Sequence, residues 1–245
     1  MPKVLISDKM SPLAEQVFKD RGIEVDVKTG MTPEELIACI GDYDGLAVRS
    51  STKAKTEIIE AATNLKVIGR AGIGVDNIDV ATATSRGVLV MNTPFGNSTT
   101  TAEHAIAMIL SLARDIPLAN ASTHLGKWEK SRFMGMEVTG KTLGIIGCGN
   151  IGSIVADRAQ GLKMKVVGYD PYLSPDRAKK LGIEKLELDD LLARADIITL
   201  HTPLTDATKD IINADSLAKT KKGVKIINCA RGGEVVEADL KQAID

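Results

Sequence analysis

A glycine-rich turn between a strand-like run and a helix-like run is the segment with the clearest chemical potential. It reads Gly-Cys-Gly-Asn-Ile-Gly over 147–152, fits the pattern G-x-G-x-x-G and directly follows the apolar run 143–146. In this pattern Gly147 allows a tight turn, Gly149 lets the backbone approach a pyrophosphate, and Gly152 allows the helix to pack closely on the sheet. The segment therefore predicts a dinucleotide-binding loop.

An acidic residue follows the next strand-like run. Asp170 directly follows the run 165–169 and lies about 20 residues beyond the glycine-rich turn. In dinucleotide-binding folds a carboxylate at this place accepts hydrogen bonds from ribose hydroxyls. The same charge repels the 2′-phosphate of NADP, so the sequence predicts NAD as the cofactor. The alternative is a solvated aspartate that caps the turn after it.

Two further strand ends carry polar residues towards the same edge of a sheet, where ligands of open α/β folds bind. The segment His-Thr-Pro-Leu occupies 201–204, and Asn-Cys-Ala-Arg-Gly-Gly occupies 228–233. The guanidinium of Arg231 can hold a carboxylate through two parallel hydrogen bonds. Its alternative is a surface arginine paired with Glu234 or Glu237.

The elements that must position these residues alternate along the whole chain. Short runs rich in Val, Ile and Leu are separated by amphipathic segments of helix length, which is typical of βαβ units and a parallel sheet. Ser11 and Thr32 each precede a proline and are expected to be helix N-caps. The expected strands are 3–7, 24–28, 45–49, 66–69, 88–91, 143–146, 165–169, 196–200 and 224–228, and the expected helices are 11–19, 33–40, 55–61, 78–85, 101–114, 151–160, 174–180, 188–194, 214–219 and 237–244.

After the turn at 92–97, the alternation of strand-like and helix-like runs gives way to one long helix-like run, which indicates a domain boundary. We expect an α/β protein with a substrate-binding domain at 1–97 and an NAD-binding domain at 98–245. A dinucleotide-binding sheet usually has about six strands, whereas four strand-like runs follow residue 140. The last helix-like run also stops at Asp245 without a C-cap signal. The second domain is therefore expected to be incomplete at its C-terminus.

The composition excludes several classes of partner. The chain has 31 Lys+Arg against 32 Asp+Glu, which argues against nucleic acid or a polybasic membrane surface as a partner. No apolar run approaches the roughly 20 residues of a membrane span. Asp8 interrupts the first apolar run, so no signal peptide is expected. The 3 cysteines lack C-x-x-C spacing and predict reduced thiols in the cytoplasm, with no metal site.

Taken together, several segments resemble the D-2-hydroxyacid dehydrogenases. They are the glycine-rich turn, 70–79 (R-A-G-I-G-V-D-N-I-D), 92–94 (N-T-P), 97–98, 102–103, 201–204 and 229–233 (C-A-R-G-G). Segments 48–50, 126–129 and 133–135 are most similar to the members that oxidise D-3-phosphoglycerate to 3-phosphohydroxypyruvate, the first step of serine biosynthesis. The resemblance implies a flavodoxin-like substrate domain followed by a Rossmann-type, doubly wound parallel-sheet cofactor domain.

The resemblance also implies roles for individual residues. Arg231 would be the catalytic residue that binds the carboxylate and carbonyl side of a small phosphorylated 2-hydroxy acid. The cofactor-binding residues would be Ile73, Gly147, Gly149, Asn150, Ile151, Gly152, Asp170, Thr202, Pro203, Cys229, Ala230 and Arg231. The substrate-binding residues would be Arg49, Ser50, Gly72, Ile73, Gly74, Asn97, Lys130 and Arg132, with the three cations receiving the phosphate. For Arg49 the alternative is a strand-end arginine on the surface without a ligand.

The general acid/base of the family is a histidine held by a glutamate, and the resemblance places both further along the chain than Asp245. None of the histidines of this chain, His104, His124 and His201, matches that position, so each is expected to be structural or on the surface. The chain also departs from the family pattern A-R-G-G-x-V-D. Glu234 stands where an apolar residue is usual, and Val236 stands where an aspartate is usual.

The resemblance further implies a homodimer or homotetramer formed through 101–132, with Trp128 as a buried anchor. A tryptophan in the core of one chain is the alternative. Two other functions stay open at this point. One is a glyoxylate or hydroxypyruvate reductase of the same family, which needs no phosphate cluster. The other is an NAD-sensing, corepressor-like binding protein.

Overall fold

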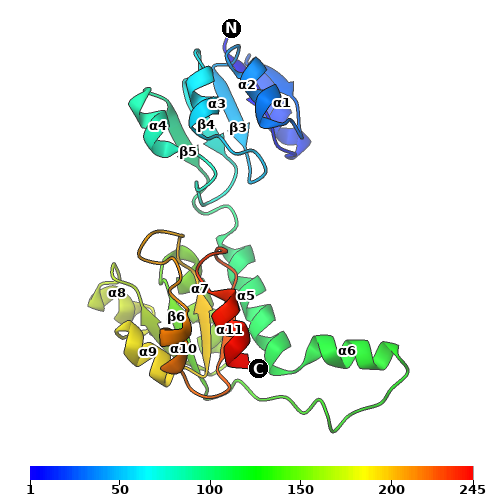
Figure 1. Cartoon of the computed structure of the whole chain (residues 1–245), viewed down its shortest axis with the longest axis vertical. Coiled ribbons are helices and arrows are strands. Elements are labelled where there is room, and N and C mark those ends of the chain that lie inside the picture. Colours follow the sequence, from blue (N-terminus) through cyan, green and yellow to red (C-terminus); the bar gives the residue numbers. More distant parts are fainter. Residues whose placement is uncertain (245) are drawn as a thin grey trace. The chain divides into compact units, whose positions relative to one another are not determined.

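A computed structural model of the chain describes residues 1–244. The chain divides into two compact units, Met1–Asn97 and Ser98–Asp245, each built around a parallel five-stranded sheet with helices beside it (Figure 1). The α/β fold class predicted from the alternating runs is confirmed.

The first unit has the flavodoxin-like strand order. Its sheet runs β2-β1-β3-β4-β5, which is the doubly wound order 2-1-3-4-5. The strands are β1 (Lys3–Ile6), β2 (Glu24–Val27), β3 (Gly45–Val48), β4 (Val67–Arg70) and β5 (Leu89–Asn92). The helices are α1 (Pro12–Asp20), α2 (Pro33–Ile40), α3 (Thr56–Ala61) and α4 (Val80–Ser85).

Local capping chemistry explains where the first helices begin. The Ser11 hydroxyl accepts a hydrogen bond from the N–H of Leu13, and Thr32 forms a reciprocal capping box with Glu35. Both expected N-caps are confirmed. Side chains from three adjacent strands and α2 fill the core of this unit, including the fully buried Leu5 and Ile40.

The second unit has the strand order of a Rossmann-type sheet. Its order is β10-β9-β6-β7-β8, which, with the strands numbered within the unit and read from β8 to β10, is 3-2-1-4-5. The strands are β6 (Thr142–Ile146), β7 (Lys165–Tyr169), β8 (Glu184–Lys185), β9 (Ile197–Leu200) and β10 (Lys225–Asn228). The helices are α5 (Ser98–Ala113), α6 (Ile116–His124), α7 (Asn150–Gly161), α8 (Pro175–Lys180), α9 (Leu188–Arg194), α10 (Ala214–Ala218) and α11 (Glu237–Ile244).

Two elements of the second unit were not expected from the sequence. β8 pairs with β7 over only two residues, so the described part of this unit has five strands where four were expected. The helix α6 follows α5 after a break at Asp115, which has a left-handed φ of 52°. Such a backbone conformation interrupts a helix, and α6 then begins at Ile116 with Pro117 in its first turn.

The apolar residues of α5 lie on two strips. Ala105 and Ile109 are fully buried, whereas Met108 is 38% exposed and Leu112 is 44% exposed. The face that packs on α7 and β10 carries smaller residues, among them Ala102 and Ala105. A second apolar strip of α5 therefore faces away from the core of its own unit.

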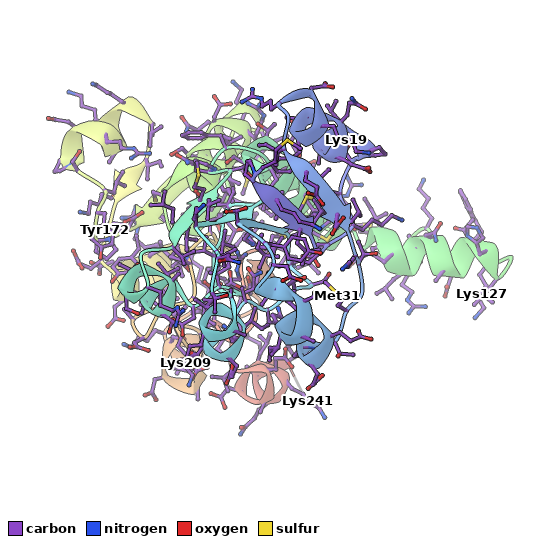
Figure 2. All side chains as sticks on the ribbon, turned by 90° about the horizontal axis from the view of Figure 1, so that it is seen from above. Lys19, Met31, Lys127, Tyr172, Lys209 and Lys241 are labelled. Atoms are coloured by element: carbon purple, nitrogen blue, oxygen red, sulfur yellow. The ribbon has the colours of Figure 1, made fainter. Side chains whose placement is uncertain are left out.

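The helix α6 extends away from the sheet of the second unit (Figure 1). Figure 2 shows the protruding helix from above, with Lys127 near its far end. Trp128, just beyond this helix, is 85% exposed, so its alternative interpretation as a core tryptophan is wrong. None of the helices among residues 1–244 is long and apolar enough to cross a membrane.

Candidate functional site

The carboxyl ends of four neighbouring strands form one edge of the second sheet. In spatial order, Arg231 follows β10, Thr202 follows β9, the glycine-rich loop follows β6 and Asp170 follows β7. The strand order reverses direction between β6 and β9, which is the point where open α/β sheets bind their ligands. Three intervals of about 4.8 Å place the two outer strands roughly 14 Å apart, a span suited to an extended dinucleotide.

The glycine-rich loop has the geometry that its pattern requires. Gly147 has a φ of +90°, and a Cβ there would lie 2.8 Å from the backbone of His201. A Cβ on Gly152 would collide with the carbonyl oxygen of Gly147, so the helix start packs directly on the turn. A Cβ on Gly149 would meet nothing within 4 Å. The space above Gly149 therefore lies open at the N-terminus of α7, whose dipole favours an anion.

Asp170 joins the end of β7 to this loop. Its Oδ2 accepts a hydrogen bond from the N–H of Cys148 at 2.8 Å, and its Oδ1 accepts one from the N–H of Tyr172 at 2.8 Å. The second contact is the turn cap that the alternative interpretation describes. A carboxylate offers about four lone-pair directions, so these two bonds leave acceptor capacity for ribose hydroxyls.

His201 lies under the loop as a neutral ring. Burial lowers the pKa of His201 from 6.5 to about 4. The ring Nε2 lies 3.0 Å from the hydroxyl of Thr199, and Nδ1 is buried without a hydrogen-bond partner among residues 1–244. His201 adds no positive charge beside the glycine-rich loop at neutral pH, in agreement with a structural role.

A buried carboxylate connects the loops after β9 and β10. Glu234 is 0% exposed, and its Oε1 accepts a hydrogen bond from the hydroxyl of Thr202 at 2.6 Å. Its Oε2 accepts a longer one from the N–H of Arg231 at 3.4 Å. Burial raises the pKa of Glu234 despite these two bonds. The side chain of Arg231 is half-buried and donates to the carbonyl of Ala230 at 2.9 Å.

Two cysteine thiols line this part of the unit. Burial and the negative charge of Asp170 raise the pKa of Cys148 to about 12, and burial also raises the pKa of Cys229. Both thiols are therefore protonated at neutral pH and act as small apolar side chains. Pro203, on the loop after β9, is exposed, and its carbonyl accepts a hydrogen bond from the hydroxyl of Thr208.

In the first unit, buried polar groups hold the loop that follows β3. The carboxylate of Asp8, 3% exposed, accepts hydrogen bonds from the N–H of Arg49 at 2.6 Å and from both the N–H and the hydroxyl of Thr52. The side-chain amide of Asn77 donates to the carbonyls of Arg49 and Thr52. This anchoring leaves the Arg49 side chain exposed, with one guanidinium contact to the carbonyl of Lys9 at 3.3 Å.

The segment 72–74 is fixed from β5. The amide of Asn92 donates to the carbonyl of Ile73 at 2.6 Å, and the N–H of Thr93 donates to the carbonyl of Gly72 at 3.0 Å. The guanidinium of Arg70 lies against Gly72, and its Nε donates to the carbonyl of Arg49. Arg49 and Arg70 thus bring two cations to the carboxyl edge of this sheet.

The remaining substrate candidates are exposed. Ser50 and Asn97 lie on the surface of the first unit. Lys130 and Arg132 belong to the second unit, beyond α6, and Arg132 forms an ion pair with Glu129 at 3.3 Å. Within each unit, the structure brings together Arg49 with the 72–74 segment, and the glycine-rich loop with Asp170, Thr202 and Arg231.

Comparison with known proteins identifies the second unit. Residues 106–245 match the family described as D-isomer specific 2-hydroxyacid dehydrogenase, NAD binding domain. The chain belongs to this family. The D-2-hydroxyacid dehydrogenase resemblance and the NAD-binding character of the Rossmann-type domain are therefore confirmed.

Curated and solved dehydrogenases extend the match over the whole sequence. D-3-phosphoglycerate dehydrogenase of Archaeoglobus fulgidus is 50% identical over 242 residues, which is 99% of this chain and 46% of that protein. The chain spans about half the length of the curated relatives it matches. A D-lactate dehydrogenase from Aquifex aeolicus, complexed with NAD and lactic acid, is 29% identical with a TM-score of 0.88, covering 99% of this chain and 73% of that one. A glyoxylate reductase from Paecilomyes thermophila is 29% identical with a TM-score of 0.91, covering 99% and 77%.

Three polar residues of the chain were not found by sequence reasoning. Asp8 and Asn77 hold the Arg49 loop from distant positions, and only their placement after β1 and inside the 70–79 segment hinted at a role. Glu234 was noted as a departure from the family pattern and as a possible partner of Arg231, but not as a buried group. An acidic residue in a position that is usually apolar was the available signal for its burial.

Proposed function

We propose that the protein of which this chain forms part oxidises D-3-phosphoglycerate to 3-phosphohydroxypyruvate with NAD, the first step of serine biosynthesis. The observation that carries the proposal is the order of groups along one sheet edge: Asp170, the glycine-rich loop, Thr202 and Arg231. They supply, in this order, a carboxylate for the ribose hydroxyls, a helix N-terminus for the pyrophosphate, a polar contact for the nicotinamide half and a cation for the substrate. This order matches the length of an extended dinucleotide.

The residues at this sheet edge are of the types that suit NAD. The open space over Gly149 admits a pyrophosphate beside the N–H groups of Asn150 and Ile151, which lack intrahelical acceptors at a helix start. Asp170 keeps lone pairs for the ribose hydroxyls and disfavours the additional phosphate of NADP. Thr202, Pro203, Cys229 and Ala230 come from the two strand ends on the nicotinamide side. When bound, NAD accepts a hydride from carbon.

Arg231 is the group of this chain that we assign to the reacting end. Its guanidinium binds the carboxylate and the C2 oxygen of the substrate, which fixes the C2–H bond relative to the cofactor. The N–H of Gly72 already donates to the carbonyl of Arg70 at 2.9 Å, so the backbone N–H groups of Ile73 and Gly74 are the candidate second set of donors for the carboxylate. No histidine of this chain is assigned to the proton transfer, since His201 is neutral and buried under the loop.

The phosphorylated substrate distinguishes this proposal from the reductase alternative. The 50% identity to a D-3-phosphoglycerate dehydrogenase, against 29% to a glyoxylate reductase, favours the phosphorylated acid. Arg49 supports it structurally because its backbone is anchored by Asp8 while its guanidinium reaches the surface beside Arg70. Lys130 and Arg132 complete the proposed set of cations, with Ser50 and Asn97 as further polar contacts.

We also propose a cytoplasmic homodimer or homotetramer. Exposed apolar side chains lie on α5 (Met108 and Leu112), on α6 (Ile116 and Leu118) and just beyond α6 (Leu125 and Trp128). Large exposed apolar patches are uncommon on monomeric proteins and mark interfaces, which supports an interface along these two helices.

Titration with the two nucleotides, followed by an assay of the full-length protein, tests the proposal. Binding of NADH with much weaker binding of NADPH, and formation of NADH from NAD and D-3-phosphoglycerate, are the expected results. Binding of NADPH as tight as that of NADH contradicts the cofactor assignment, and NADH binding without turnover of any 2-hydroxy acid favours the sensor.

A further inference from the structure

The carboxylate of Glu234 is an unusual group in the second unit, because it is completely buried and yet close to the sheet edge where the cofactor is proposed to bind. Its backbone is fixed: the N–H of Ile212 donates to its carbonyl at 3.0 Å, and the neighbouring Val235 forms a β-bridge with Ile212. The side chain therefore has little freedom to move away from its two partners. A buried carboxylate without a function is costly, since its desolvation is only partly offset by hydrogen bonds.

Glu234 connects the loops after β9 and β10 directly, and it reaches the loop after β6 through Thr202. Its strong hydrogen bond is to the Thr202 hydroxyl at 2.6 Å, on the loop after β9. The Cγ2 methyl of Thr202 in turn lies 2.8 Å from where a Cβ of Gly147 would be, so Thr202 packs against the first glycine of the phosphate loop. The other carboxylate oxygen accepts from the N–H of Arg231, on the loop after β10.

We propose that Glu234 is a positioning residue for the nicotinamide half of the cofactor site, an inference that rests on the proposed NAD-dependent function. The carboxylate fixes the rotamer of Thr202 against Gly147 and holds the backbone at Arg231 at a set spacing from it. The loops after β9 and β10 are thereby pre-ordered before the cofactor arrives, which lowers the entropic cost of binding. Glu234 itself does not touch the cofactor.

A merely structural role predicts a different set of outcomes. Replacing a buried carboxylate by an apolar side chain of similar volume is often neutral or stabilising for the fold. Positioning therefore predicts that Glu234→Leu binds NADH more weakly while its Tm is unchanged or higher. A structural role predicts a lowered Tm with unchanged affinity in the folded protein.

The experiment measures the Kd of NADH by fluorescence titration and the Tm of the same samples for the chain, Glu234→Leu, Thr202→Val and the double variant. Each single variant is expected to bind NADH about tenfold more weakly, because a buried donor or acceptor loses its partner. The double variant is expected to be no weaker than Thr202→Val, because Thr202→Val already breaks the connection to Glu234 that Glu234→Leu removes. Thr220→Val is the matched control: it removes a half-buried hydroxyl bonded to Leu217 at the opposite edge of the sheet and should leave the Kd unchanged.

Glu234→Gln keeps an oxygen acceptor for Thr202 and is expected to retain the NADH affinity of the unmodified chain to within about threefold. If Glu234→Leu does not fold, Glu234→Gln and Thr202→Val still test the inference. Unchanged NADH affinity in Glu234→Leu, or losses that multiply in the double variant, overturn the inference and leave the proposed function intact. Absence of NADH binding by the unmodified chain overturns both.

Discussion

The carboxylate of Asp170, at the end of β7, accepts a hydrogen bond from the N–H of Cys148, the second residue of the glycine-rich loop, at 2.8 Å. One group therefore serves two purposes in this account. It shapes the glycine-rich loop through Oδ2, and in the proposed NAD complex its remaining lone pairs would accept from the ribose hydroxyls. The loop geometry and the choice of nucleotide would then be coupled through a single side chain.

Asp170→Ala is expected to weaken NADH binding by at least about tenfold, because it removes the loop contact and the ribose acceptor together. NADPH binding should weaken less, since the repulsion of the 2′-phosphate disappears as well. Nucleotide titrations of the two proteins measure this change in preference. Asp189→Ala, which removes an exposed ion pair with Lys219, is the control. Equal losses for NADH and NADPH would argue against a ribose contact.

The glycines of the loop should respond to alanine in opposite ways. Gly149→Ala meets no atom within 4 Å and has an ordinary φ of −70°, so the Tm should hold while NADH affinity falls sharply. Gly152→Ala forces a Cβ against the carbonyl of Gly147 and should lower the Tm by several degrees. Thermal melts with NADH titrations separate the two effects. Tight NADH binding by folded Gly149→Ala would show that the pyrophosphate does not lie there.

The buried imidazole of His201 should make the fold sensitive to acid. Because the pKa of His201 is about 4 in the folded chain and 6.5 ordinarily, the unfolded chain binds more protons between these values. Stability therefore rises with pH across that window and is lost as the pH falls through it, by up to about 3 kcal/mol. Urea unfolding at pH 7 and pH 4 should show a smaller loss for His201→Gln than for the unmodified chain.

The exposed His124 provides the matched control, and His124→Gln should keep the acid sensitivity of the unmodified chain. The same loss of stability in His201→Gln as in the unmodified chain would assign the acid sensitivity to other groups, among which Asp79 has a pKa lowered to about 2 by its hydrogen bonds.

The apolar surface on α5 and α6 predicts self-association. Trp128→Ser combined with Leu125→Asp should reduce the dimer or tetramer to a monomer, because both side chains are exposed in the single chain. Analytical ultracentrifugation measures this directly. Tyr172→Ser, which removes an aromatic ring that is 95% exposed elsewhere on the same unit, should leave the assembly unchanged. An unmodified chain that sediments as a monomer at high concentration would refute the interface.

Local signals in the sequence predicted most elements of both sheets. Apolar runs identified the strands of four or five residues, and the hydroxyls of Ser11 and Thr32 identified helix starts, because each signal lies within a few residues of its effect. β8 escaped detection because two residues carry no periodicity. The helix α6 was missed because the break at Asp115 depends on one backbone angle.

The site was predictable where a motif carries its own geometry and unpredictable where it depends on distant partners. The glycine-rich loop follows from three glycines at fixed spacing, whereas the anchoring of Arg49 depends on Asp8, which is 41 residues away in the sequence. Similarly, the bond from Glu234 to Thr202 joins residues 32 apart. Contacts of this kind follow from the fold and leave no local pattern.

The most direct test of the account compares kcat/KM of the full-length protein for 3-phosphohydroxypyruvate, hydroxypyruvate, glyoxylate and pyruvate with NADH, in parallel with Arg49→Ala and the surface control Arg21→Ala. The account predicts a strong preference for the phosphorylated acid, a loss of that preference in Arg49→Ala and none in Arg21→Ala. Equal or better use of the unphosphorylated acids by the unmodified protein would contradict it.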